Sequence, residues 1–535
     1  MLKPSRVLLS LAIAFIAYLG FGQVREVVEI GPAKQAALAI TADLGVEPLP
    51  QSERTPPPDT QPNIIVILAD DMGWRDIGYN HSDIRTPVMD RLAGEGITLN
   101  RFYSQPTCSP TRAALLTGRA PLRHGILSPL SKNNAAGLPL EETTLADELK
   151  AAGYQTALTG KWHLGARDLN YHPNARGFDH FYGHLTGATG YFNKIHGGGY
   201  DWQRNGVSVR EGGYTTHLIA DEAAQLIRDR DADRPLFLYV AFGAPHIPNE
   251  APEAAIETYS GIRDRTRRVH AAMVSEMDIA TGEIHEALVD EEIEDNTLIW
   301  FMSDNGGLIR DNPARFVPEP FFTRAVEARF EVEATPRFVE FVRQNLRHGG
   351  SDNRPLRGAK QTLLEGGVRV PSFLYWPGTF DPKSYNYMVT VQDVMPTLLD
   401  VAGIQPSGIE FDGQSVWTGL TTDTPAATRE YIIQTDRLAD SEAIYRYPFK
   451  LIVEQGGDRK LYDVEADPFE QTDIARDNLE LVAELTSYLD AFPRGQNIAI
   501  PFQDAVDDPD FFGGEEDREP WAERAYGRAP SRPAR

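Results

Sequence analysis

The most regular feature of the chain is a set of short, apolar runs with almost no polar residue inside them. They span residues 63–69, 235–241 and 297–302. Runs of this length without polar alternation are typical of strands that are buried on both faces, as in a parallel sheet. Residues 144–152 and 218–228 show helical periodicity instead. The alternation predicts an α/β fold, with a mostly parallel central sheet and helices on both of its faces.

The pattern changes toward the C-terminus. Short β-like pieces at residues 430–435 and 449–453 precede an amphipathic helix at 479–489. They predict a smaller α+β subdomain over residues 426–502, after a main domain over 62–425. Within the main domain, residues 308–350 are predicted to be an insertion with a helical segment at 337–348.

Both ends of the chain have the composition of segments outside the folded domains. Two basic residues, Lys3 and Arg6, precede an apolar run that ends near Phe21, which predicts a signal peptide over residues 1–22. An uncleaved anchor is the alternative for this segment. Residues 23–61 are expected to form a linker, and the acidic residues 503–535 a poorly ordered tail. The protein is therefore expected to be exported, to the periplasm or outside the cell, with no other membrane insertion.

Charge limits the partners of the protein. The 535 residues carry a formal net charge of −25, and an acidic body repels nucleic acids and anionic membrane surfaces. An anionic small ligand would need a local group of cations. The one cysteine, Cys108, cannot form an intramolecular disulfide, although exported proteins commonly use cysteines in pairs. It is either a buried apolar thiol or a residue with its own chemistry.

Acidic residues follow two of the apolar runs. Asp70 and Asp71 come directly after the first run, and Asp304 and Asn305 come shortly after the third. Ligands in open α/β sheets bind beyond the carboxyl ends of the strands, so both pairs are expected to face one crevice. Their oxygens suit a hard cation such as Ca²⁺ or Mg²⁺. Helix caps and turns are the alternative use of such residues.

Cys108 opens the sequence Cys-Ser-Pro-Thr-Arg-Ala-Ala-Leu-Leu-Thr-Gly-Arg, which ends at Arg119. Pro110 and the residues after it predict a helix that begins just past the cysteine, where free backbone N–H groups favour an anion. Arg112 lies one turn along the same face. The whole segment resembles the signature of type I sulfatases, in which the cysteine is oxidised to formylglycine.

Other segments resemble the same family. They lie at residues 159–165, 244–248, 357–361, 365–371 and 461–468, so the resemblance covers about residues 62–475. It implies an alkaline-phosphatase-like fold and a Ca²⁺ site (or Mg²⁺) formed by Asp70, Asp71, Cys108, Asp304 and Asn305. It also implies a group of catalytic residues around the sulfate: Cys108, Arg112, Lys161, His163, His246 and Lys360.

The resemblance assigns roles within this group. Cys108 would become an aldehyde whose hydrate attacks sulfur and then expels sulfate. The three cations, Arg112, Lys161 and Lys360, would stabilise charge on the sulfate oxygens. His246 would protonate the leaving alcohol, and His163 would contact the diol.

Residues 176–183 and 353–358 look most like arylsulfatases of the N-acetylgalactosamine-4-sulfatase type. The expected substrate is therefore a sulfated sugar or polysaccharide fragment, and the expected maturation partner is a formylglycine-generating enzyme. Two alternatives stay open. One is a formylglycine-dependent hydrolase of phosphonate or phosphate esters on the same scaffold, and the other is a secreted binding protein that has lost turnover.

Overall fold

The computed structural model describes residues 61–196, 199–308, 321–330, 339, 348–406, 408–422, 424, 431–436 and 441–499. The predicted signal peptide, all but the last residue of the predicted linker and the predicted acidic tail lie outside these ranges. Within these ranges, no helix combines the length and the apolar character that crossing a bilayer requires.

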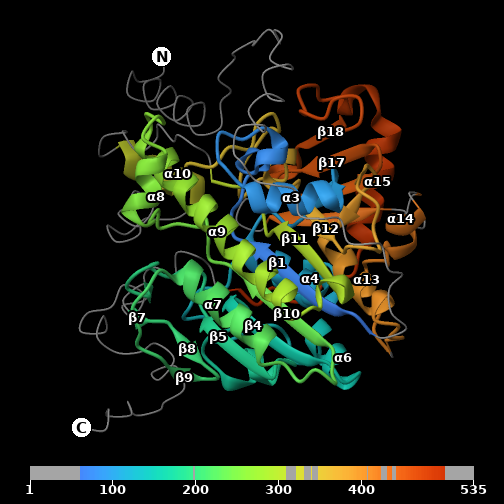
Figure 1. The fold of residues 1–535 in the computed structure, drawn as a ribbon. Helices are drawn as coiled ribbons and strands as arrows, with labels where there is room; N and C mark the ends of the chain where they lie inside the picture. Colours follow the sequence, from blue (N-terminus) through green and yellow to red (C-terminus); the bar gives the residue numbers. More distant parts are fainter. Residues whose placement is uncertain are drawn as a thin grey trace.

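A ten-stranded mixed sheet forms the middle layer of the molecule (Figure 1). In spatial order its strands are β13 (Lys383–Tyr385), β2 (Ile97–Leu99), β12 (Ser372–Tyr375), β11 (Thr297–Ser303), β1 (Asn63–Ala69), β10 (Leu236–Ala241), β4 (Gln155–Lys161), β5 (His180–His184), β8 (Gln203–Arg204) and β9 (Val207–Ser208). The central five, from β11 to β5, are parallel to one another. On the flanks, β12 runs antiparallel to β11, and β8 runs antiparallel to β5.

The three apolar runs are the three central strands β1, β10 and β11. Every residue of β1 is buried, because its alternate side chains enter two separate cores. Ile64, Val66 and Leu68 pack into one core, while Ile65 and Ile67 pack into the other. A strand with apolar side chains on both faces requires a covering layer on each side, and this is what the helices provide.

Helices cover both faces of the sheet (Figure 1). One layer holds α4 (Cys108–Thr117), α6 (Leu145–Ala151) and α13 (Val394–Val401), and the other holds α3 (Pro87–Glu95), α7 (Thr215–Arg228) and α9 (Arg265–Asp290). The predicted helix at 144–152 is α6, which begins after its N-cap Thr144. The predicted helix at 218–228 is α7, which begins three residues earlier. The predicted fold class is confirmed.

Several shorter elements complete the main part of the chain. The helices are α5 (Pro121–His124), α8 (Glu253–Thr258), α12 (Glu365–Val368) and α14 (Trp417–Thr422), and two small sheets pair β3 (Phe102–Tyr103) with β14 (Val389–Thr390) and β6 (Ile195–His196) with β7 (Gly199–Tyr200). Most of the predicted insertion at 308–350 lies outside the described residues. Its described part includes α10 (Phe321–Phe330), and the helical segment expected at 337–348 stays a prediction.

The C-terminal subdomain is a four-stranded antiparallel sheet with a helix on one face. It comprises β15 (Ile432–Asp436), β16 (Ser441–Arg446), β17 (Phe449–Val453), β18 (Arg459–Asp463) and α15 (Leu479–Ala491). Side chains such as Ile444 and Leu451 face α15. Side chains of the other face, such as Tyr445, pack against Tyr103 and Val368 of the main domain. Both faces of this sheet are therefore covered, and one of them is covered by residues near the ends of the central strands.

Candidate active site

The residues singled out in the sequence meet at the carboxyl edge of the central sheet. Asp70 and Asp71 follow β1, Asp304 follows β11, and Lys161 is the last residue of β4. These strands and β10 lie side by side and parallel, so their carboxyl ends share one edge. The sequence prediction that the acidic pairs face one crevice agrees with this arrangement.

Three carboxylates and three cations alternate at this edge. The Lys161 ammonium lies 2.6 Å from Asp70 Oδ2. The Lys360 ammonium lies 2.8 Å from Asp71 Oδ2, and the Arg112 guanidinium lies 3.0 Å from Asp304 Oδ2. All six side chains are buried or nearly so. Buried charges are tolerated in proteins when they are paired, so the six groups form one interdependent unit.

The carboxylates of this unit differ in pKa. Burial raises the pKa of Asp71, but the positive charge of Lys360 and hydrogen bonds from Lys360 and Asn305 outweigh it and lower the pKa to about 2. For Asp304, burial and the charge of Asp70 together raise the pKa to about 7, in spite of Arg112. Negative charge around Asp304 is thus incompletely compensated, and a bound cation would relieve it.

Two buried oxygens test whether these residues fit a metal ion. Neither Asp70 Oδ1 nor Asn305 Oδ1 has a hydrogen-bond partner, although buried polar atoms normally have one. Asp70, Cys108 and Asp304 each offer a ligand atom within 4.8 Å of the others. The Asn305 amide nitrogen donates to Asp71 Oδ1 at 2.7 Å, which leaves its oxygen free. The oxygen-rich set fits Ca²⁺ or Mg²⁺.

Cys108 is the first residue of α4 and is 2% exposed. Burial raises the pKa of its thiol. A thiol with a raised pKa is a poor nucleophile at neutral pH. The cysteine is therefore well placed between the carboxylates and cations, but it is not activated as a thiol.

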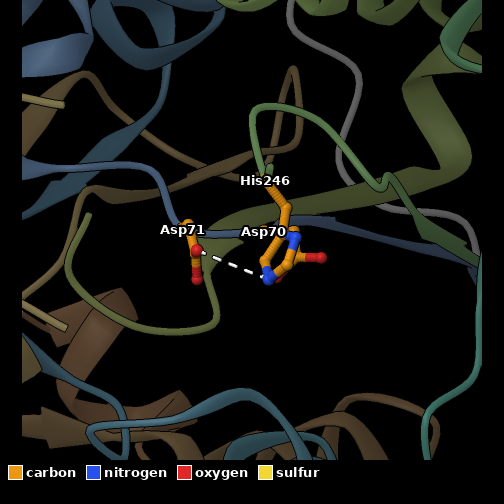
Figure 2. A group of neighbouring side chains, drawn as sticks. All are labelled: Asp70, Asp71 and His246. Carbon is orange, nitrogen blue, oxygen red and sulfur yellow. Dashed lines mark ion pairs between the residues drawn. The ribbon is translucent and has the colours of Figure 1, made fainter. Parts of the chain in front are cut away.

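The two histidines are neutral in this arrangement. Burial, followed by the charge of Lys360, lowers the pKa of His246 to about 3. Its Nδ1 donates to the Ile247 carbonyl at 2.6 Å, so its Nε2 carries the lone pair and points toward Asp71, 3.6 Å from Oδ2 (Figure 2). Burial likewise holds the pKa of His163 well below its usual range. His163 Nε2 donates to the Leu130 carbonyl at 3.0 Å, and its Nδ1 is buried without a partner.

Two residues of the site have a left-handed backbone conformation. Asp71 has a φ of 66° and His163 has a φ of 62°. Such conformations are unfavourable for residues other than glycine and collect at functional sites, where the surrounding structure holds them in place. Asp71 comes directly after Asp70, and His163 comes two residues after Lys161, at the carboxyl edge of the sheet.

A small cavity adjoins Asp70 and His246. Its other lining residues include His184, Thr189, Tyr191 and Thr215. The Tyr191 hydroxyl lies 2.6 Å from the Gly243 carbonyl and 2.8 Å from the His246 carbonyl, so this wall is tied to the loop after β10. The sequence analysis did not identify these lining residues. His184 and Thr215 lie at the ends of β5 and α7, and Thr189 and Tyr191 lie in a loop without a recognisable pattern.

The sequence analysis also missed residues that hold the predicted ones in place. The Thr111 hydroxyl donates to the Asp304 carbonyl at 2.6 Å, and the Ser303 hydroxyl accepts the backbone N–H of Met72 at 3.0 Å. The first bond joins α4 to the turn after β11. The second joins the last residue of β11 to the segment after β1. A signal for Thr111 existed, because it lies three residues after Cys108 on the same helix face.

Comparison with known proteins identifies the family. The sulfatase family model matches residues 62–404. Arylsulfatase J of Mus musculus is 35% identical over 376 residues, which cover 68% of this chain and 56% of that relative. Human N-acetylgalactosamine-6-sulfatase is 33% identical over 368 residues, which cover 64% of this chain and 63% of the relative. The solved structure of Ps i-CgsB in complex with k-i-k-neocarrahexaose has a TM-score of 0.71 at 28% identity and covers 83% of this chain and 95% of that one. The family resemblance predicted from the sequence is thus confirmed, and the chain belongs to the sulfatase family.

Proposed function

We propose that this protein hydrolyses sulfate esters of sulfated sugars, after conversion of Cys108 to formylglycine. One observation carries the proposal: the lone cysteine lies at the start of α4, between the Asp70 and Asp304 carboxylates, within the group of three cations. The sugar substrate is supported by the names of relatives, which include an N-acetylgalactosamine-6-sulfatase and a structure in complex with k-i-k-neocarrahexaose. Export and maturation by a formylglycine-generating enzyme belong to the same proposal.

Asp70, Asp71, Asp304 and Asn305 would hold a Ca²⁺ ion, with Mg²⁺ as the alternative, next to the side chain of residue 108. When bound, the ion would polarise the sulfate and lower the pKa of a neighbouring hydroxyl. The charges support this assignment. The three carboxylates match the three cations in number, and a dication that enters with a monoanionic ester adds one positive charge, which the negative charge around Asp304 can offset.

A hydrated formylglycine supplies two hydroxyls, one to attack sulfur and one to expel sulfate, whereas a serine or cysteine has only one such group. The side chains around it would bind and orient the ester. Each lysine ammonium has three N–H donors, so Lys161 and Lys360 can keep their carboxylate partners and still donate to sulfate oxygens. Arg112 is more constrained, because its guanidinium also donates to the Lys161 carbonyl at 3.0 Å. Arg112 therefore holds the site together as well as adding positive charge.

His246 is the proposed acid for the leaving alcohol. Because it is neutral, His246 must first receive the proton that it gives to the leaving alcohol. The hydroxyl at position 108 loses a proton when it attacks sulfur, and His246 Nε2 is the nitrogen available to receive such a proton and pass it to the leaving oxygen. Negative charge that develops on the leaving oxygen would raise the pKa of the imidazole and favour this transfer. His163, whose Nδ1 has no partner, is the proposed contact to the hydroxyls at position 108.

The first test measures sulfate release from sulfated monosaccharides, oligosaccharides and an aryl sulfate, with matched phosphonate esters alongside. The protein is co-expressed with a formylglycine-generating enzyme, and Cys108→Ala is the control. We expect sulfate release that disappears in the control. Faster cleavage of the phosphonates would favour the alternative hydrolase, and absence of any turnover with formylglycine verified at position 108 would favour a binding protein.

The metal site has a separate test that does not depend on turnover. Calcium binding to the Cys108→Ala protein is measured by calorimetry, and Asp71→Asn is compared with it. The substitution removes one charged ligand, so we expect the affinity to fall by at least about tenfold. Equal affinities in the two proteins would exclude Asp71 from the site.

A further inference from the structure

Residues 357–370 form a segment that carries Lys360 to the active site and contacts two other parts of it. Three backbone hydrogen bonds join the segment to its surroundings: Lys360 N–H to the Gly307 carbonyl at 3.2 Å, Gln361 N–H to the Pro106 carbonyl at 2.9 Å, and Gly306 N–H to the Gly367 carbonyl at 2.9 Å. The segment therefore contacts the turn that follows the Asp304 ligand and the stretch that precedes Cys108. A shift of this segment would displace Lys360 and both neighbours together.

The opposite side of the segment is held by the C-terminal subdomain. Lys450 lies on β17, and its ammonium is 3.2 Å from Glu365 Oε1 and 2.6 Å from Glu470 Oε1. All three side chains are fully buried. Glu470 also binds the segment at two points, because its Oε2 accepts the Glu365 N–H at 2.7 Å and its carbonyl accepts from Arg357 Nη1 at 2.6 Å.

A contact that served only to join the two parts of the chain would not need these charges. Apolar and aromatic side chains beside the cluster, among them Val368, Ile432 and Ile452, already bury surface between the main domain and the C-terminal sheet. Burying the two carboxylates with Lys450 and Arg369, whose Nη1 lies 3.7 Å from Glu365 Oε2, is expensive compared with apolar packing. Ionic hydrogen bonds are directional, whereas apolar contacts are not. Each of these bonds therefore fixes one atom of the segment at a defined position. The Tyr103 hydroxyl adds a further bond of this kind, to Glu365 Oε2 at 2.9 Å.

We propose that the buried cluster of Glu365, Lys450 and Glu470 is a positioning device that sets Lys360 for binding of the sulfate group. The C-terminal subdomain is then a working part of the active site, although none of the three residues touches the reacting atoms. The inference rests on the proposed function, because it takes sulfate as the group that Lys360 binds.

Backbone hydrogen exchange tests the positioning itself. In Lys450→Met, an unbranched apolar side chain replaces the lysine and removes the one ammonium that joins the two carboxylates. The amides of residues 360–367 should therefore exchange at least about tenfold faster than in the parent protein. Lys460→Met is the matched control, since Lys460 lies in the same sheet but pairs with Glu454 at the surface. Glu470→Gln is the second variant in case Lys450→Met fails to fold. Unchanged exchange in the folded variants overturns the proposal.

A double-mutant cycle tests the link to sulfate. Binding of inorganic sulfate to the full-length, Ca²⁺-loaded Cys108→Ala protein is measured with Lys450→Met, with Lys360→Ala and with both. We expect Lys450→Met to weaken binding about tenfold when Lys360 is present and less than about twofold when it is absent. Equal weakening in both backgrounds would indicate a general structural role and overturn the proposal. If the parent binds no sulfate, the proposed function fails, and the exchange measurement still decides whether the cluster holds the segment.

Discussion

Gly307 has no room for a side chain. A β-carbon at this position would lie 1.7 Å from Ser351 Oγ and 2.8 Å from the Asp71 carbonyl. An alanine must therefore displace the segment that carries Asp71 or the one that carries Ser351. Misplacement of catalytic groups by about 1 Å can cost about a hundredfold in rate, so we expect Gly307→Ala to lower kcat/KM for a sulfate ester by at least about tenfold.

Gly94 provides the matched control for this substitution. It lies in α3, where a β-carbon meets nothing within 4 Å, so Gly94→Ala should leave kcat/KM within about twofold of the parent. Both variants are assayed with thermal unfolding measured alongside. Gly307→Ala with full activity would show that the close approach around Asp71 is not needed for catalysis.

The sequence was sufficient to predict which residue types form the active site and roughly where they lie. It was not sufficient to predict which cation pairs with which carboxylate. Asp70 and Asp304 were found because each follows a buried apolar run, and Cys108 because its surrounding motif is long. Which cation pairs with which acid depends on strand order, and no local pattern specifies it. The buried ion pairs of Asp76 were not predicted for the same reason. Its partners Arg267 and His270 lie far along the chain, on α9.

At the scale of elements, an ionic group ties edge strands to a covering helix. Glu222 on α7 accepts from His180 on β5 at 2.8 Å and from Arg204 Nε on β8 at 3.0 Å. Burial raises its pKa, but the hydrogen bonds from His180 and Arg204 outweigh burial and lower the pKa from 4.5 to about 2. A carboxyl with a depressed pKa stabilises the fold above its unfolded pKa, and this contribution is lost as the pH falls toward the folded pKa.

The contribution of Glu222 can be measured as a difference between proteins. Solvent screens this partly exposed group, whose partner Arg204 is 40% exposed, so the lowered pKa contributes less stability at pH 7 than the full shift implies. Glu222→Gln should reduce the free energy of unfolding there by about 1–2 kcal/mol. Between pH 5 and pH 3 the difference from the parent should shrink by about half. Urea unfolding at a series of pH values measures both the stability difference at pH 7 and its decrease between pH 5 and pH 3. A difference that stays constant with pH would mean that the carboxylate charge contributes nothing.

Elements were predictable where their sequence is regular. The runs that form β1, β10 and β11 are apolar at almost every position. This pattern is typical of strands that are covered on both faces. The flanking strands were not predictable in this way. β2 has three residues and β12 has four, which is too short to show a period, and both depend on partners that are distant in sequence.

At the scale of the whole molecule, the fold encloses Cys108, the residue whose modification we propose. Cys108 is 2% exposed, and every residue of α4 is buried between the central sheet and its neighbours. A small sulfate ester has to reach only the side chain of residue 108, whereas a modifying enzyme must bind the stretch of chain around it, and that stretch includes the buried helix α4. Releasing α4 from the core would require opening of the surrounding structure, at a cost that approaches that of global unfolding. For a typical domain this is about 5–15 kcal/mol, so the open form is rare. We therefore expect the proposed conversion to formylglycine to precede folding.

This order of events can be checked with protein made in a host that lacks the modifying enzyme. The folded, unmodified protein and the same protein held unfolded are each incubated with a formylglycine-generating enzyme, and the aldehyde at position 108 is measured by mass spectrometry. A peptide covering residues 104–119 controls for activity of the enzyme under the conditions used. We expect conversion of the peptide and the unfolded chain, and at least about a hundredfold slower conversion of the folded protein, because cleavage or modification of a closed site follows the population of the open form. Equal rates for the folded and unfolded chains would mean that α4 opens readily, and the enclosure of Cys108 would then be no barrier to its modification.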